Sequence, residues 1–433
     1  MGDSGLVAIA LLVLLYAAVS KRLQGTVVTP AIVFVAGGML VSSEGLGWLD
    51  PTIQSELVRL VAEATLTLVL FSDASRIDLP ALRREYALPL RLLAIGLPLT
   101  IVAGALAGVG VLGELVLIEA IALAVVLAPT DAALGQAVVT DRRVPSRVRQ
   151  GLNVESGLND GICVPLLLIV IAIAEAEEGV IGNGEAVRLV LEEIGYGALG
   201  GVIAGAAAAA VVRLGVGRGL VDRLWLQTVP VAGAALAYGL AAWLGGSGFI
   251  AAFVGGALFG GLRRDVGGEV TEFLEEGGNV LGAVTFILFG AVMLVPVLDE
   301  LSVEIVLYAL LSLTVVRMVP VAVALLGTGA RRPTVAFVGW FGPRGLASIV
   351  FAVILVDEAE LAGETLLLNT IFVTIALSVL LHGLTASPLA ARYARWYEAH
   401  PPEALPAFEG APAPEQRPPL GVGAAREMMS RRD

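Results

Sequence analysis

Long apolar segments recur along almost the whole chain, and they limit what it can fold into. A helix needs about 20 apolar residues to cross a hydrocarbon core of about 30 Å. We find thirteen segments of roughly this kind, at residues 5–20, 26–42, 55–72, 86–110, 115–139, 149–174, 190–212, 226–244, 247–262, 278–298, 303–327, 334–356 and 365–387. Charged residues make up 15% of the chain, against about 25% in soluble domains. The sequence therefore predicts an all-α polytopic membrane protein with about 13 transmembrane helices.

The loops between these segments alternate in charge. Loops after the even-numbered spans are mostly acidic, with Arg59 and Arg188 as the exceptions. Loops after the odd-numbered spans carry the basic residues Lys21, Arg22, Arg76, Arg83, Arg84, Arg142, Arg143, Arg147, Arg149, Arg213, Arg218, Arg223, Arg263, Arg264, Arg331, Arg332, Arg392 and Arg395. Because basic loops stay on the cytoplasmic side, we expect the N-terminus outside and the C-terminus in the cytoplasm.

Domain organisation follows from the same pattern. Residues 1–390 form one predicted transmembrane domain. From His400 onward the chain becomes rich in proline and charge and loses its apolar periodicity, which is typical of disorder. We therefore expect residues 391–433 to form a disordered cytoplasmic tail.

Three carboxylates lie within the fifth and sixth apolar segments, at Asp131, Glu155 and Asp160. An ionised group at the centre of a bilayer costs at least about 2.5 to 3.5 kcal/mol, so such groups are functional candidates by default. Asp131 follows Pro129 and Thr130, and a proline inside a helix removes a hydrogen bond and breaks the turn. A simple proline kink would need no carboxylate beside it. A carboxylate next to freed carbonyl oxygens is instead a ligand set that suits a hard cation.

Helical spacing sorts the polar groups of the sixth segment onto two faces. Ser156 and Asp160 are four residues apart and share one face, while Glu155 and Asn159 share the neighbouring face. We assign the first pair to the transported ion and the second pair to supporting the site. The predicted ion-binding set is Asp160, Asp131, Ser156 and the backbone or hydroxyl oxygen of Thr130, with Na+ held at Asp131, Ser156 and Asp160.

A buried Glu155 needs a cationic partner, and the late segments offer two, Arg317 and Arg344. Arginine stays charged and binds carboxylates bidentately, which suits a permanent pair. We favour Arg317 for Glu155. Arg344 lies next to Pro343 in a break that matches the break at Pro129, where its charge can offset the carbonyl ends of a broken helix, as Asp131 can offset amide ends. Broken helices in corresponding halves are typical of an inverted-repeat transporter.

Together these residues resemble the monovalent cation:proton antiporter-1 family, the NhaP-like sodium/proton exchangers. The resemblance covers roughly residues 5–390 and lies in the motifs Thr130-Asp131, Glu155-Ser156, Asn159-Asp160, Arg317 and Gly342-Pro343-Arg344-Gly345. It implies an NhaA/NhaP-like antiporter fold with inverted repeats and two crossed discontinuous helices, in the inner membrane of a prokaryotic cell. The Asn159-Asp160 pair is similar to that of electroneutral members. Ala132-Ala133 stands where Pro-Val is often found, so selectivity does not follow from the resemblance.

The resemblance also implies a division of labour among the helices. An acidic residue at the inner end of the third span, Asp73 here, would lie near the ion path. Helices in residues 5–72 and 190–298 would form the dimer domain of a homodimer, and those in 86–174 and 303–387 the moving core.

The function that these features predict is secondary active exchange of Na+, or Li+, for H+, electroneutral and 1:1, by alternating access. A proton and a cation would compete for Asp160, and no enzymatic activity, nucleic-acid partner or cofactor beyond the transported ions is expected. A K+/H+ antiporter of the same fold is the first alternative. A cation channel is a second, disfavoured because no repeated filter loop is visible. A symporter for an organic solute should have more aromatic groups than this 6% aromatic chain, and a membrane hydrolase would need a nucleophile and base or a metal-binding cluster that the sequence does not suggest.

Overall fold

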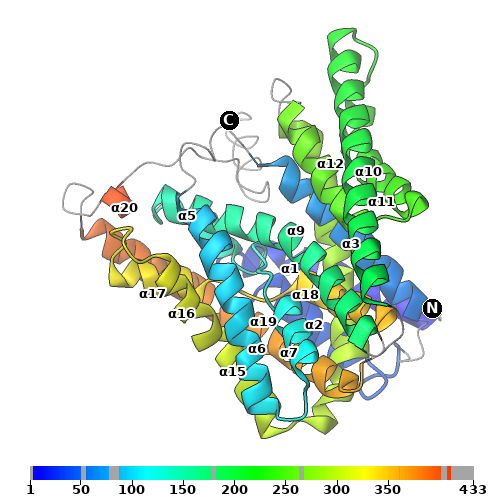
Figure 1. Cartoon of the computed structure of the whole chain (residues 1–433). Coiled ribbons are helices and arrows are strands. Elements are labelled where there is room, and N and C mark those ends of the chain that lie inside the picture. Colours follow the sequence, from blue (N-terminus) through cyan, green and yellow to red (C-terminus); the bar gives the residue numbers. More distant parts are fainter. Residues whose placement is uncertain are drawn as a thin grey trace. The chain divides into compact units, whose positions relative to one another are not determined.

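The computed structural model describes residues 3–49, 55–77, 87–177, 182–262, 268–359, 361–400 and 407–410. Within these ranges all regular structure is helical, which confirms the predicted fold class (Figure 1). Arg83, Arg84, Arg263 and Arg264, which contribute to the predicted orientation, lie outside the described residues.

The chain divides into two compact units. The first comprises residues 1–66, 86–193 and 280–412, and the second comprises 67–85, 194–279 and 413–433. The helices are α1 (Asp3–Leu23), α2 (Pro30–Val41), α3 (Ser55–Ser75), α5 (Ala87–Arg91), η1 (Leu92–Gly96), α6 (Leu97–Leu112), α7 (Leu117–Val126), α8 (Gln136–Val139), α9 (Ser146–Glu177), α10 (Asn183–Gly217), α11 (Arg223–Leu244), α12 (Gly248–Leu262), η2 (Gly268–Thr271), α13 (Glu272–Leu288), η3 (Phe289–Leu294), α14 (Val295–Val297), η4 (Leu298–Glu300), α15 (Val303–Leu313), α16 (Val315–Ala324), α17 (Arg332–Trp340), α18 (Leu346–Glu358), α19 (Glu364–Glu398) and α20 (Ala407–Gly410).

Among the described residues, eight helical stretches are long and apolar enough to cross a membrane, and three shorter apolar helices accompany them. Every predicted span contains helix, so the protein is a multi-pass membrane protein. The count of thirteen spans, the orientation of the termini and the division into dimer domain and core stay predictions. α10 and α19 have 35 residues each, more than the roughly 20 that a bilayer requires, so they tilt or extend beyond the hydrocarbon.

Two predicted spans are interrupted near their middle, as the prolines indicated. α7 ends at Val126 and α8 begins at Gln136, with Pro129 between them. α17 ends at Trp340 and α18 begins at Leu346. We call residues 127–135 the first break and residues 341–345 the second break.

Small residues allow the helices of the second unit to pack closely. Ala204, Ala237, Ala241 and Ala251, from α10, α11 and α12, form a buried cluster. A Cβ atom added at Gly201 would lie only 3.0 Å from the Cα atom of Ala251. Figure 1 shows these three helices in green, side by side. Packing through small residues is how membrane helices commonly associate.

The C-terminal region departs from the predicted disordered tail, so the boundary at residue 391 is wrong. α19 continues as helix to Glu398, and α20 follows at Ala407–Gly410. Aromatic side chains explain this order, because Tyr393 and Phe408 are each 4% exposed and pack into the apolar core of the first unit. The prediction made from composition missed these anchors. Residues 401–406 and 411–433 of the predicted tail lie outside the described residues.

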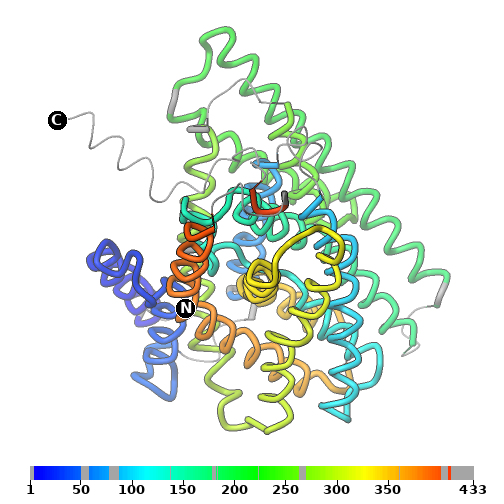
Figure 2. Tube along the Cα trace, turned by 90° about the vertical axis from the view of Figure 1, so that its left-hand side faces the viewer, coloured from blue at the N-terminus to red at the C-terminus, as the bar shows by residue number. Residues whose placement is uncertain are grey.

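Glu409 fixes α20 to the start of α17. Its Oε1 atom accepts hydrogen bonds from the backbone N–H of Arg331 (2.8 Å) and from Thr334 Oγ1 (2.7 Å). Its side chain is buried, and Thr334 also lies 2.9 Å from the hydroxyl of Tyr393. Figure 2 shows α20, in red, beside α17, in yellow. A carboxylate at a helix N-terminus satisfies free amides and opposes the positive end of the dipole.

We expect Glu409→Ala to release the first turn of α17. The amide of Arg331 should exchange with deuterium about tenfold faster, because its acceptor is lost. Hydrogen–deuterium exchange mass spectrometry of peptides that cover residues 328–340 measures this. Glu398→Ala is the control, since Glu398 is exposed at the end of α19. Equal protection in both variants would contradict the capping role.

Candidate functional site

The two breaks are bonded directly to one another at Asp131. The backbone N–H of Asp131 donates to the carbonyl oxygen of Pro343 at 2.8 Å. The carboxylate of Asp131 accepts from the backbone N–H of Leu346 at 3.0 Å through Oδ2, and from that of Ala133 at 2.8 Å through Oδ1. The first break therefore supplies a donor to Pro343 in the second break and an acceptor to Leu346 at the start of α18.

This arrangement contains the helix-end charge that the sequence predicts for Asp131. Leu346 is the first residue of α18, so its N–H is one of the amides that a helix leaves without an internal partner. A negative side chain at that end is favourable. A carboxylate has about four lone-pair positions, so the backbone donors of Ala133, Leu134 and Leu346 leave Asp131 room to bind a cation.

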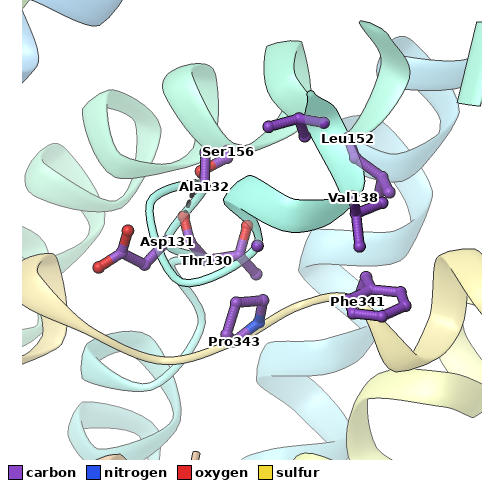
Figure 3. Close-up of a pocket in the computed structure, with 10 residues that line it drawn as sticks. Thr130, Asp131, Ala132, Val138, Leu152, Ser156, Phe341 and Pro343 are labelled. Carbon is purple, nitrogen blue, oxygen red and sulfur yellow. Dashed lines mark hydrogen bonds between the residues drawn. The ribbon is translucent and has the colours of Figure 1, made fainter. Parts of the chain in front are cut away.

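α9 approaches the first break through Thr130. Ser156 Oγ donates to the carbonyl oxygen of Thr130 at 2.5 Å, and Asn159 Nδ2 donates to the hydroxyl of Thr130 at 2.7 Å. All three residues are buried. Both predicted faces of the α9 segment thus meet at one residue of the break, and Figure 3 shows the bond between Ser156 and Thr130.

A small pocket that is partly open to solvent lies beside the first break. Its lining residues are Thr130, Asp131, Ala132, Gly135, Val138, Val139, Leu152, Ser156, Phe341 and Pro343. Three of the predicted ion-binding residues are therefore in its wall. Asp160, one helical turn beyond Ser156, is buried at 6% exposure and is not among the lining residues. In Figure 3 the carboxylate of Asp131 points away from the rings of Pro343 and Phe341.

Glu155 and Arg317 form a buried ion pair on the other side of α9. Arg317 Nη1 lies 2.6 Å from Glu155 Oε1, and Nη2 lies 2.9 Å from Oε2. Each side chain is 3% exposed. Of the two arginines considered for Glu155, the structure pairs it with Arg317. Arg344 is fully buried and donates through Nη1 to the carbonyl oxygen of Gly342, which lies within the second break.

The two glycines of the second break make room for the charged groups. A Cβ atom at Gly345 would lie 2.8 Å from the Cβ atom of Asp131 and 2.9 Å from its Cγ atom. A Cβ atom at Gly342 would lie 2.9 Å from Cζ of Arg317. Carbon atoms do not approach this closely, so a methyl group at either position would force the charged side chain beside it to shift.

We expect Gly345→Ala to reduce cation/proton exchange at least about tenfold, because the added methyl group displaces Asp131 from Leu346. The measurement is the rate of cation-driven dissipation of a pH gradient in proteoliposomes. Gly110→Ala is the matched control, since nothing lies within 4 Å of a Cβ atom at this position of α6. Full activity of Gly345→Ala would show that the position of Asp131 is not critical.

Asp73 lies in the second unit. It is half-buried near the end of α3, and its Oδ1 atom lies 3.7 Å from Arg76 Nη1. Arg76 also donates through Nε to Glu275 Oε1 at 2.9 Å. A place for Asp73 on the ion path stays a prediction.

Sequence reasoning gave no role in the site to two residues of α19 that bond the backbone in or next to the second break, Ser378 and His382. Arg344 donates its backbone N–H to Ser378 Oγ, and His382 Nε2 lies 3.0 Å from the carbonyl oxygen of Trp340. Their spacing of four residues places them on one helix face. Polar residues at this spacing in an apolar helix are a signal that could have identified them.

Two interrupted helices that meet at buried charged groups define the class of secondary transporters with discontinuous helices. The chain belongs to the sodium/hydrogen exchanger transmembrane family, whose sequence model matches residues 7–392. Its fold is also that of a solved relative, because the sodium proton antiporter MjNhaP1 from Methanocaldococcus jannaschii at pH 8 superposes with a TM-score of 0.70, at 18% identity, over 88% of this chain and 98% of that chain.

Curated relatives carry two different ion names. The K(+)/H(+) antiporter NhaP of Alkalimonas amylolytica is 25% identical over 412 residues, which are 92% of this chain and 66% of that protein. The Na(+)/H(+) antiporter NhaP of Pseudomonas aeruginosa is 27% identical over 350 residues, which are 75% of this chain and 78% of that protein. The chain thus spans slightly less than two thirds of the first relative's length.

Proposed function

We propose that the chain exchanges one monovalent cation, Na+ or Li+, for one proton across the membrane. The observation that carries this proposal is the bidentate pairing of Glu155 with Arg317. Arg317 neutralises Glu155, so Asp160 is the carboxylate in this part of α9 whose charge changes during transport. Asp160 is buried one helical turn after Ser156. A buried carboxylate that holds either a proton or a cation is the simplest exchanging group.

The oxygen atoms around the first break suit the cation. The carbonyl oxygen of Thr130 and Oγ of Ser156 are 2.5 Å apart, and Asp131 is adjacent in the chain. Hard cations prefer such carboxylate, carbonyl and hydroxyl oxygens. We assign Asp160, Asp131, Ser156 and Thr130 to ion binding, with Asn159, Glu155, Arg317 and Arg344 holding them in place.

Competition between a proton and a cation for the Asp160 carboxylate couples the transport of one to the transport of the other. With a proton or a monovalent cation bound, Asp160 is neutral and can move with the core. Empty, it is a buried charge whose passage through the bilayer is costly. Exchange of one cation for one proton transfers no net charge. The neutral Asn159 beside Asp160 supports this stoichiometry, because it adds no second titrating group.

K+ is the second candidate for the cation, because one relative is named as a K(+)/H(+) antiporter and another as a Na(+)/H(+) antiporter at nearly equal identity. We further propose alternating access by a core of residues 86–174 and 303–387 that moves against a dimer domain of residues 5–72 and 190–298. In this proposal the protein is a homodimer with an external N-terminus and a cytoplasmic C-terminus, and it needs no cofactor beyond the transported ions.

An ion-gradient assay on purified protein in liposomes tests the proposal. A pH gradient is formed, Na+, Li+ or K+ is added, and its dissipation is followed with the membrane potential either clamped or free. We expect dissipation with Na+ and Li+ at a rate that does not depend on potential. Faster exchange with K+ would establish the alternative cation. Cation flux without proton movement would overturn exchange in favour of a channel.

A further inference from the structure

α19 contacts the backbone on both sides of Pro343, which lies in the second break. Trp340 is the last residue of α17, and its carbonyl oxygen lies 3.0 Å from His382 Nε2. Arg344, on the other side of Pro343, donates its backbone N–H to Ser378 Oγ at 2.6 Å. One pair of side chains on α19 therefore holds the backbone before and after Pro343.

Both ring nitrogens of His382 lie near a backbone carbonyl oxygen, which only accepts hydrogen bonds: Nε2 is 3.0 Å from that of Trp340, and Nδ1 is 3.1 Å from that of Ser378. The hydroxyl of Ser378 lies 3.2 Å from Nδ1. With the single proton on Nε2, Nδ1 is the acceptor for this hydroxyl. Because this hydroxyl accepts from Arg344, its own proton is available for Nδ1. A single proton on Nε2 thus completes a continuous chain of hydrogen bonds.

The surroundings hold the imidazole in this orientation. His382 is 1% exposed, and its ring lies against the indole of Trp340 with centroids 5.0 Å apart. The indole N–H of Trp340 donates to Thr385 Oγ1 at 3.0 Å, one turn further along α19. A second proton on the ring would turn Nδ1 into a donor and remove the acceptor of the Ser378 hydroxyl.

We propose that Ser378 and His382 are positioning residues that fix the geometry of the second break for cation binding. The break is held on one face by Asp131, which bonds to Pro343 and Leu346, and on another by this α19 pair. If the α19 pair releases the backbone, the groups that orient Asp131 shift. Supporting shells of this kind determine how well a binding group is placed. The inference rests on the proposed function, because Asp131 is assigned there to the cation.

A spectroscopic experiment tests the geometry without any transport assay. The chain has two histidines, so His400→Gln leaves His382 as the only imidazole. In protein labelled with 15N at the ring nitrogens, we expect NMR to show a neutral ring protonated at Nε2, with Nδ1 as an acceptor, at the pH of transport. A proton on Nδ1 alone, or an imidazolium ion, would overturn the hydrogen-bond chain.

A transport experiment tests the consequence. His382→Ala should raise the cation concentration for half-maximal exchange about tenfold, with a smaller change in maximal rate. His382→Gln should restore most of the affinity, since its amide can donate to Trp340. Thr374→Val is the control, because the hydroxyl of Thr374 bonds the carbonyl oxygen of Thr370 within α19, and it should behave as wild type. Equal defects in the Ala and Gln variants, or unchanged half-saturation in His382→Ala, would overturn the positioning role. If the wild-type protein moved cations without protons, the proposed function would fail while the NMR result stood.

Discussion

Asp160→Asn should reduce cation-dependent dissipation of a pH gradient to the level of protein-free liposomes. The amide has nearly the shape of the carboxylate, but it cannot take up a proton from the aqueous phase and carries no charge for a cation. Asp160 is buried at 6% exposure in the middle of α9, so bulk water cannot substitute for the lost group. The measurement is the recovery of a trapped pH-sensitive dye after the addition of Na+ or K+.

Two further variants separate chemistry from folding in this experiment. Asp299→Asn makes the same substitution at an exposed position in η4 and should leave exchange intact. Asp160→Glu keeps a titrating carboxylate one methylene further from the backbone and should retain exchange with an altered cation affinity. Full exchange by Asp160→Asn would eliminate this residue as the exchanging group and leave Asp131 as the remaining candidate.

The parts of this site that the sequence predicts are those in which a costly residue interrupts an apolar run. Pro129 and Pro343 each mark a break, because proline removes a helical hydrogen bond and each stands close to a charged residue. Proline alone is not sufficient, since α9, α11, α16 and α19 each contain one inside a continuous helix. Asp131 beside Pro129 indicates a helix-end charge for the same local reason. Spacing also separates Ser156 from Asn159, because helical geometry fixes the angle between them. These inferences need no knowledge of distant contacts.

Other features depend on residues far apart in the chain. Glu155 and Arg317 are 162 residues apart, and the sequence offers Arg344 as an equal chemical match. The need for glycine at 345 appears only once Asp131 is seen against it. α20 was missed because its neighbours resemble a disordered tail in composition, whereas two anchoring side chains, Phe408 and Glu409, decide its place. The composition of a segment does not reveal the effect of two such anchoring residues.

Glu155→Gln should destabilise the protein by about 3 to 5 kcal/mol, the usual cost of leaving a buried charge without its partner. The side chain of Arg317 is 3% exposed, and its guanidinium binds both carboxylate oxygens of Glu155. The amide would keep one acceptor and place its N–H₂ group against the other guanidinium nitrogen. Thermal unfolding of the purified protein in one detergent, at a fixed heating rate, should show a lower midpoint for this variant and for Arg317→Gln.

The double variant Glu155→Gln with Arg317→Gln distinguishes a paired charge from two independent losses. Removing both charges also removes the unpaired ion, so we expect the double variant to be more stable than either single variant, which requires a coupling energy larger than either single loss, more than about 3 kcal/mol. The exposed pair of Arg188 and Glu192 supplies a matched cycle, for which surface pairs predict at most about 1 kcal/mol. Additive losses at Glu155 and Arg317 would mean that the ion pair does not hold α9 to α16. Asp160 would then lose the neutral surroundings on which one-for-one exchange depends.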